Sequence, residues 1–464
     1  MSVTDQSEAG AVTPHLAMPQ VPDRPLSLFQ FMRVLRDNSL ATYRREAYSA
    51  DILERRLFWK RSFFVNEPDG IKHVLLDNAA NYRKTELTRR LLEPGLGRGL
   101  LTSEGETWRR HRRIMAPAFD HRSIIGYAPI MTEIAERLVA EWDGRPAGSE
   151  IDIAAAMMHG TLHIISRTMF SSDSDEIVDV VERGVERYQT EIRPGLVDLL
   201  ELPAWLSRVT SVRRAERIFS EFDRAIDRLL AAREGNRSSQ HKDLLARLIA
   251  ARDEETGGGM SAEEVRNQVV TIFMAGHETT ALALTWTWYL LSQHPAVEAK
   301  LHLELDAALG GRTPRHDDLA KLPYARMVIE EAMRLYPPAH TLSRTAIGED
   351  EVLGRHIPKG AQMLIVPWLL HRNPRLWPDA ERFDPERFAP ERAASRQRFA
   401  YIPFGAGPRI CIGAAFAMAE AMLILATVAQ HYRLRLKPGF PVEPQGLITL
   451  RARHGMRMVP ERRG

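Results

Sequence analysis

FGAGPRICIG, residues 404–413, contains the only cysteine in a chain of 464 residues. Its three glycines permit backbone torsions and close approaches that a side chain would block, so the segment can fold under a flat, bulky ligand. Residues 412–430 are rich in Ala, Met and Leu and predict a helix, which places Cys411 at a positively charged helix start and favours its thiolate form. Taken alone, such a cysteine fits a nucleophile, a metal ligand or a small buried apolar residue, and the last is the commonest.

The spacing Phe-Gly-x-Gly-x-Arg-x-Cys-x-Gly resembles the heme-binding loop of the cytochrome P450 family. In that family the cysteine thiolate is the axial ligand of the heme iron. The resemblance implies heme b (iron protoporphyrin IX) as cofactor, Cys411 as the iron ligand, Phe404 packed beneath a loop that includes Gly405 and Gly413, and Arg409 paired with a heme propionate. A dinucleotide-binding loop is the competing interpretation of these glycines, and it fails because the third glycine of that pattern is missing.

Composition predicts one large unit. Hydrophobic residues make up 44% and charged residues 27%, a balance typical of a globular protein with a sizeable core, and no internal repeat or long linker divides the chain. The resemblance implies a mainly α cytochrome P450 fold, a large helical unit with a smaller β-sheet region. We expect residues 1–23 to form a flexible N-terminal segment and residues 24–464 to form a single heme domain.

Charge and hydropathy exclude several kinds of partner. The net charge is +3 and the pI is about 9.0, which is too mild to indicate nucleic acid. The first 25 residues contain no apolar run of signal-peptide type, and the longest uncharged stretch, residues 279–297, is interrupted by polar residues and proline. A single cysteine excludes an intrachain disulfide and suits a reducing compartment. We therefore predict a cytoplasmic protein without a membrane anchor.

Residues 108–113 read WRRHRR, and Trp108 and Arg112 lie four positions apart on one face of a predicted helix. They match the Trp-x-x-x-Arg pattern of the resembled family, which implies that both bond heme propionates, a task for which a forked guanidinium is suited. A solvated basic face is the alternative. Both interpretations hold if the side chain of Arg112 turns inward while those of Arg109, Arg110 and Arg113 turn outward toward an acidic partner.

A long helix is predicted after a capping box formed by Ser261 and Glu264, and it persists to about Gln293, before His294-Pro295. Roughly 32 residues give a helix of about 48 Å, which must cross the core.

The hexapeptide AGHETT stands near the middle of this helix, and the Thr279 hydroxyl is expected to turn toward the Ala275 carbonyl, bend the helix and open a groove. It matches the family pattern Ala-Gly-x-(Asp or Glu)-Thr-Thr. The resemblance implies that Glu278 and Thr279 deliver protons for dioxygen cleavage and that Gly276 leaves room for oxygen. His277 should point away, about 100° around the helix. A buried helix whose glutamate meets an arginine is the alternative.

Glu331 and Arg334 form an i, i+3 pair that usually contributes little. They match the family's Glu-x-x-Arg, whose partner is the arginine of Pro-Glu-Arg-Phe, here Arg387. The resemblance therefore implies a buried structural network of these three residues. Removing one member would leave a buried charge without a partner. Residues 339–344 should enter the pocket as an extended strand, with Arg344 at the family's propionate-binding position.

Three further segments have weaker predictions. Residues 56–66 are rich in aromatic residues with polar breaks and predict a hairpin, and residues 93–100 are rich in glycine and predict a loop. By resemblance, residues around 170–210 form mobile helices over the substrate pocket.

The leading hypothesis is a heme-thiolate monooxygenase that uses dioxygen to oxidise a small apolar substrate. Only 53 residues follow Cys411, so we expect electrons from a separate ferredoxin or flavodoxin-type donor with its reductase. A peroxide-dependent peroxygenase would need no donor, but such enzymes typically replace the acid and the alcohol that Glu278 and Thr279 provide. A non-enzymatic heme sensor would have no use for these two residues. A cysteine hydrolase would need a histidine near Cys411, and no sequence feature designates one.

Overall fold

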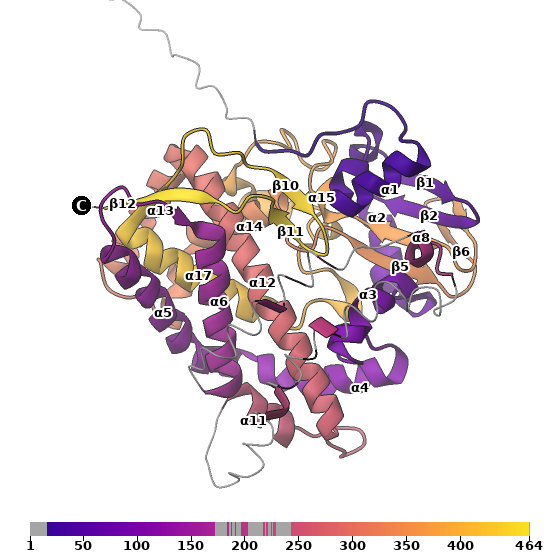
Figure 1. Cartoon of the computed structure of the whole chain (residues 1–464), viewed down its shortest axis with the longest axis horizontal. Helices are drawn as coiled ribbons and strands as arrows, with labels where there is room; N and C mark the ends of the chain where they lie inside the picture. The colour runs from indigo at the N-terminus through magenta and orange to yellow at the C-terminus, as the bar shows by residue number, and fades with distance from the viewer. Residues whose placement is uncertain are drawn as a thin grey trace, which may run out of the picture.

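The computed structural model describes residues 16–171, 196–202 and 243–463, together with a few single residues between 183 and 228. Helices dominate these parts of the chain, and the largest sheet lies at the side of the molecule opposite to α5, α13 and α17 (Figure 1). The mainly helical fold with a smaller β-sheet region is therefore confirmed. Much of the segment expected to cover the pocket, residues 170–210, lies outside the described residues.

The described helices are α1 (Leu28–Asp37), α2 (Pro68–Lys72), α3 (Glu86–Leu96), α4 (Gly105–Met115), α5 (His121–Asp143), α6 (Ile153–Phe170), α8 (Leu196–Leu199), α11 (Leu244–Ala250), α12 (Ala262–Gln293), α13 (Pro295–Leu309), α14 (Pro323–Leu335), α15 (Pro367–Leu370), α16 (Pro390–Ala394) and α17 (Ala414–His431).

The described strands are β1 (Ile52–Leu57), β2 (Lys60–Val65), β3 (Tyr82–Arg83), β4 (Ile151–Asp152), β5 (Leu342–Ala346), β6 (Asp350–Val352), β7 (Arg355–Ile357), β8 (Gln362–Ile365), β9 (Tyr432–Leu436), β10 (Pro444–Gly446), β11 (Leu450–Ala452) and β12 (Arg457–Arg462). The largest sheet has the order β1-β2-β8-β5-β3, in which only β2 and β8 are parallel. A three-stranded sheet has the order β4-β12-β9, and β6-β7 and β10-β11 form separate pairs.

The long helix α12 organises the core, as the sequence predicts. It has 32 residues, and Ser261 and Glu264 form the expected capping box at its start. It packs against α6, α14 and α17 and runs through the middle of the molecule in Figure 1. Most of its residues are buried, since helices surround it on several sides.

Helix α17 is long and apolar enough to cross a membrane, but 67% of its residues are buried inside the protein. It packs against α5, α12 and α14, and a central helix of a globular core meets the same criteria of length and composition.

Two local predictions near the pocket have different outcomes. The hairpin predicted over residues 56–66 is present as β1 and β2, joined by a two-residue turn between Leu57 and Lys60, but its first strand begins earlier, at Ile52. The loop predicted over residues 93–100 is wrong for its first half, because α3 continues through Pro94 to Leu96. Pro94 has no backbone N–H to donate, but it lies in the last turn of α3, so the helix loses only a hydrogen bond near its end and continues past the proline. The chain turns at Gly97, which has a φ of +58° and where a Cβ would lie 2.1 Å from Oδ1 of Asn267.

Part of the expected N-terminal segment packs on the core. The amide of Ala17 donates to the Tyr289 hydroxyl at 3.2 Å, and the Tyr336 hydroxyl donates to the Ala17 carbonyl at 2.9 Å. Leu16 and Met18 also contact the core. The domain boundary at residue 24 stays a prediction.

The carboxylate of Glu331 is the centre of the predicted buried network. Its two oxygens accept from Nε and Nη2 of Arg334 at 2.6 and 2.8 Å, and Nε of Arg387 lies 3.4 Å from Oε1. The amide of Asp384 also donates to Oε1, at 3.0 Å. Arg334 in turn donates to the carbonyls of His371, Ala380 and Arg382. The side chains of Glu331 and Arg334 are fully buried, so this contact fixes the segment 371–387 against α14.

Glu331→Gln removes the charge that two buried guanidinium groups face. We expect a loss of about 3–5 kcal/mol in the free energy of unfolding, measured by urea denaturation, because the arginines then remain buried without a counter-ion. Glu106→Gln breaks an exposed i, i+3 pair with Arg109 and should change stability by less than about 1 kcal/mol. Equal losses in the two variants would contradict the role given to Glu331.

Candidate active site

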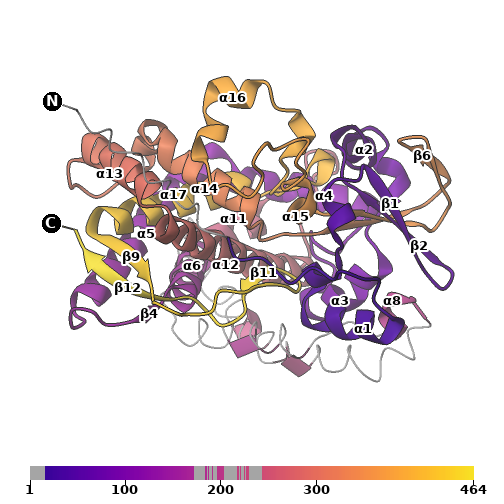
Figure 2. The same cartoon turned by 90° about the horizontal axis from the view of Figure 1, so that it is seen from above.

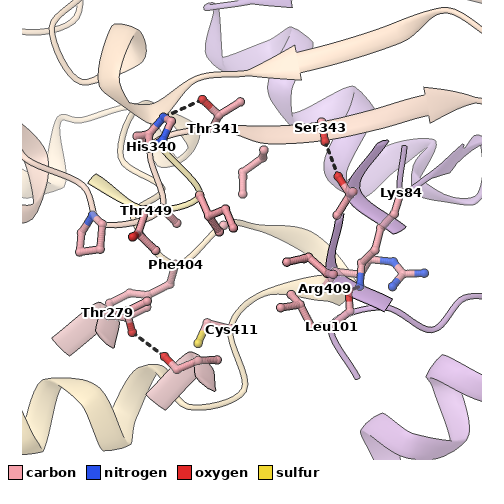
Figure 3. Close-up of a pocket in the computed structure, with 18 of the residues that line it drawn as sticks. Lys84, Leu101, Thr279, His340, Thr341, Ser343, Phe404, Arg409, Cys411 and Thr449 are labelled. Carbon is pink, nitrogen blue, oxygen red and sulfur yellow. Dashed lines mark hydrogen bonds between the residues drawn. The ribbon is translucent and has the colours of Figure 1, made fainter. Parts of the chain in front are cut away.

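A cavity of about 750 Å³ lies between α12 and the cysteine loop. Cys411 is exposed to it, and α3, the β1–β2 hairpin and β5 contribute further lining residues. In Figure 3 the sulfur of Cys411 lies near Phe404 and Thr279, with Lys84 and Arg409 to one side and His340 and Thr449 to the other. The structure therefore gathers residues that are up to 365 positions apart in the sequence, from Lys84 to Thr449.

The cysteine loop has the tight backbone that its glycines predict. The amide of Cys411 donates to the Phe404 carbonyl at 2.9 Å, which closes the loop. Gly405 and Gly407 have φ values of +72° and +69°, and a Cβ on Gly407 would lie 1.8 Å from the Leu75 carbonyl oxygen. Gly413 has an ordinary φ of −90° and its nearest neighbour would lie 3.9 Å from a Cβ, so no contact within the protein requires glycine there.

The predicted preference of Cys411 for the thiolate form is wrong for the protein without metal. Burial raises the pKa of the Cys411 thiol above its usual value. The backbone N–H of Gly413 and the charge of Arg112 lower this pKa only in part. The backbone N–H at the helix start therefore lowers the pKa of Cys411, as expected, but by less than burial raises it.

Positive side chains gather at one side of the cavity. Trp108, Arg112, Arg344 and Arg409 all line it, as the sequence predicts. The Arg112 guanidinium donates to the Ile410 carbonyl at 2.8 Å, next to the cysteine. Arg409 lies over the Trp108 ring at 4.2 Å.

Arg409 is ion-paired with Glu104, an acid that sequence reasoning did not single out. Arg344 donates to the Ser343 carbonyl at 2.8 Å, and no carboxylate of the described residues lies within ion-pairing distance of it. Burial, with a contribution from Arg409, lowers the pKa of Arg344 to about 10.

Lys84 is a further cation that no sequence motif indicated. Its ammonium group donates to the carbonyls of Leu100 and Leu101. Burial first, and then the charge of Arg409, lower the pKa of Lys84 to about 7.

These residues fit a heme. Lys84, Arg112, Arg344 and Arg409 line this side of the cavity, and of these four only Arg409 has an ion-pair partner among the described residues, Glu104, so the cavity has a positive potential that a pair of propionates would neutralise. Cys411 opens onto the same space, and the free position beside Gly413 leaves room for a flat ring.

On the facing wall, Thr279 takes the predicted conformation, because its hydroxyl donates to the Ala275 carbonyl at 2.8 Å. The α-helix is nevertheless continuous from Ala262 to Gln293, so the expected opening does not interrupt it. A Cβ on Gly276 would lie 3.3 Å from Cδ1 of Ile165 on α6, so close helix packing also favours glycine at this position. His277 points away from the cavity, as predicted, and its Nδ1 contacts the Phe273 carbonyl at 2.6 Å.

Glu278 lines the cavity but is held by the C-terminal hairpin. Its Oε1 lies 2.6 Å from Nη2 of Arg451 and accepts from the Thr449 hydroxyl at 2.6 Å. Burial raises the pKa of Glu278, but the charge of Arg451 and the hydrogen bond from Thr449 outweigh it, so the pKa lies below its usual value. Glu278 is therefore ionised at neutral pH. Thr449 and Arg451 follow a loop in the last sixteen residues, and no local pattern could have identified them.

The outward arginines of α4 are largely neutralised within the protein. Arg110 pairs with Glu264 at 2.6 Å, Arg113 with Asp253 at 2.8 Å, and Arg109 with Glu106. The expectation of free positive charges for an acidic partner is therefore corrected, because acids on neighbouring segments supply their counter-ions.

Comparison with known proteins agrees with this geometry. A family model described as cytochrome P450 matches residues 19–451. "Cyclooctatin synthase" from Streptomyces melanosporofaciens is 38% identical, and the alignment covers 89% of each chain. "Cyclooctat-9-en-7-ol 5-monooxygenase" from the same organism is 36% identical over 84% of this chain and 83% of its own. The crystal structure of the cytochrome P450DA heme domain superimposes with a TM-score of 0.82, at 26% identity, over 97% of this chain and 98% of the other.

The chain belongs to the cytochrome P450 family. It is accordingly an oxidoreductase of the monooxygenase type, and members of the family use a heme iron, dioxygen and redox partners to oxidise organic substrates.

A buried acid that sequence reasoning missed connects α17 with the active-site helix. Glu420 is 1% exposed, and neither carboxyl oxygen has a hydrogen-bond partner of normal geometry. Burial raises the pKa of Glu420 from 4.5 to about 8, and the nearby Thr280 hydroxyl lowers it in part. Thr280 follows Thr279 directly and also lines the cavity. Glu420 is therefore a neutral acid at pH 7.

Glu420 should make stability depend on pH. Between pH 4.5 and about 8 the unfolded chain ionises this residue while the folded chain keeps it protonated, so its contribution to stability is lost as pH rises. We expect Glu420→Gln to lack this dependence and to gain several kcal/mol relative to the native chain by pH 8, measured by urea unfolding from pH 5 to 9. The exposed control Glu391→Gln should keep the native pH profile. A profile unchanged by Glu420→Gln would refute the assignment.

Proposed function

We propose that this protein is a heme b monooxygenase with Cys411 as the axial ligand. It inserts one atom of dioxygen into a C–H bond of a small apolar substrate. The observation that carries the proposal is the position of the single cysteine, on a cavity wall opposite the Ala-Gly-x-Glu-Thr-Thr turn of α12 and beside cations that have no ion-pair partner among the described residues. Electrons come from a ferredoxin or flavodoxin-type donor with its reductase, in the cytoplasm, which the single cysteine supports.

The residues proposed to hold the heme surround the cavity. When bound through a thiolate, heme supplies the activation of dioxygen. Phe404, Gly405 and Gly413 support the ring on the cysteine side, and Ala275 and Gly276 face it from α12. The propionates bind the cationic side, formed by Trp108, Arg112, Arg344 and Arg409, to which we add Lys84.

Thr279 and Glu278 are proposed to control protons. The Thr279 hydroxyl lies on the cavity wall and donates to a helix carbonyl, so a small rotation would present its proton to the cavity instead. Glu278, ionised next to Arg451, is able to accept a proton and return it. Because Thr279 and Glu278 are on one turn of α12, the protons that replace those donated by Thr279 can arrive through Glu278 without crossing the substrate region.

The substrate is proposed to be apolar because leucines dominate the nearby wall. Leu87, Leu91, Leu92 and Leu96 of α3 all line the cavity. Such a surface favours hydrocarbon over charged ligands. The relatives named for cyclooctatin and cyclooctat-9-en-7-ol support a compact hydrocarbon skeleton.

The iron ligand is tested by the spectrum of the reduced, heme-loaded protein with carbon monoxide. We expect the red-shifted Soret band of a thiolate-ligated heme, and its loss in Cys411→His, because no other cysteine can replace the ligand. A native protein without this band, or a variant that keeps it, would overturn the assignment.

Thr279→Val keeps the shape of the side chain but removes the hydroxyl. With a ferredoxin and its reductase as electron source, we expect product formed per electron consumed to fall by about tenfold or more, because general acid catalysis is lost. Thr279→Ser restores the hydroxyl and should recover most of the coupling. Equal coupling in Thr279→Val and the native protein would exclude the proposed role.

A further inference from the structure

A second hollow, of about 600 Å³, shares no lining residue with the active-site cavity. Its walls come from the segment 373–378, from α16 and the chain that follows it, and from the start of α2. In Figure 2, α16 and α2 lie along the edge of the molecule opposite to α1 and α8. We call this hollow the arginine cleft.

The arginine cleft has an excess of positive charge. Its two carboxylates already have partners, since Asp51 pairs with an arginine and Oε2 of Glu67 accepts the amides of Asp69 and Gly70 at 2.8 and 3.0 Å. The four guanidinium groups on the wall belong to Arg375, Arg387, Arg392 and Arg396. Two of these arginines also contact acids outside the wall, Arg387 with Glu331 and Arg392 with Asp384, so the uncompensated positive charge is that of Arg396.

Arg396 is the cation with the least compensation. Arg375 pairs with Asp51, and Arg392 with Asp384 at 3.0 Å, but no carboxylate of the described residues lies within ion-pairing distance of Arg396. Its guanidinium instead lies over the rings of Trp377 and Phe388, at 4.5 and 4.4 Å, and donates to the Arg387 carbonyl. The rings hold this cation in place without neutralising it.

Buried hydrogen-bonding groups on the same wall lack partners. Nε1 of Trp377 is a donor without an acceptor, although this residue is only 2% exposed. Oδ1 of Asn66, a residue 4% exposed, is an acceptor without a donor. Native proteins satisfy most buried polar groups, so these two atoms, together with the guanidinium of Arg396, point to a ligand with acceptor oxygens and a hydroxyl.

We propose that the arginine cleft binds a phosphate-type anion. Hydrogen phosphate supplies negative charge to face Arg396, several acceptor oxygens for the arginines and Trp377, and one hydroxyl for Asn66. A phosphomonoester offers the same charge but no hydroxyl, so free phosphate is the preferred ligand. Because Arg387 also contacts Glu331, the bound anion stabilises the buried network of Glu331, Arg334 and Arg387.

The proposal is tested on the full-length, heme-loaded protein. Inorganic phosphate, glycerol 3-phosphate and sodium chloride are titrated at one pH and constant ionic strength, with calorimetry and the melting temperature as readouts. We expect saturable binding of phosphate, weaker binding of glycerol 3-phosphate and no saturation with chloride. Arg396→Gln should weaken phosphate binding by about tenfold or more, because it removes a charge-assisted donor.

Two further variants make the test specific. Arg392→Gln changes an exposed side chain, so it should fold normally and also weaken binding. Arg398→Gln removes a nearby exposed arginine that does not line the cleft, and it should leave binding unchanged. Tighter binding of glycerol 3-phosphate would identify the phosphoryl group of a larger molecule as the ligand and so support the site. Absence of saturable phosphate binding, or an equal loss in Arg398→Gln, would overturn the proposal.

Discussion

The contact of one buried carboxylate, Glu331, with the guanidinium groups of Arg334 and Arg387 is the constraint on which the site depends. A carboxylate without water is stable only when every oxygen is paired, and here two arginines and a backbone amide provide the partners. Arg334 then holds three carbonyls of the segment 371–382. The segment that leads to the cysteine loop is therefore held against α14, and the position of the Cys411 sulfur depends on a contact that lies outside the lining of the cavity.

The two walls of the cavity handle charge in opposite ways. On the α12 wall, Glu278 is neutralised by Arg451, so the apolar region near it contains no free charge. On the other side, desolvation lowers the pKa values of Lys84 and Arg344, and no carboxylate of the described residues lies within ion-pairing distance of either. The two propionates of the proposed heme would supply the missing negative charge. The chain by itself is thus electrostatically incomplete on one side of the pocket.

The sequence predicted the elements whose signals are local. The capping box and hydrophobic period located α12, and glycine spacing located the cysteine loop. The loop prediction was wrong for residues 93–96 because the glycine content of residues 93–100 was given too much weight, and α3 continues to Leu96. Lys84, Thr449 and Arg451 could not be found, since they reach the site only through long-range packing. The neutralisation of Arg110 and Arg113 likewise depends on acids about 140 to 150 residues away in the chain.

The cavity wall holds the only thiol of the chain, and that thiol is exposed to the cavity. Electrophiles and oxidants therefore have a single thiol to attack, at a rate limited by its raised pKa, and if Cys411 holds the heme iron as proposed, its modification would remove the axial ligand in the same event. A molecule whose pocket is filled shields this atom, whereas an empty one does not. Under the proposed ligation, sensitivity to oxidation would therefore fall once the heme is bound, and chains that have not yet acquired it would be the most vulnerable.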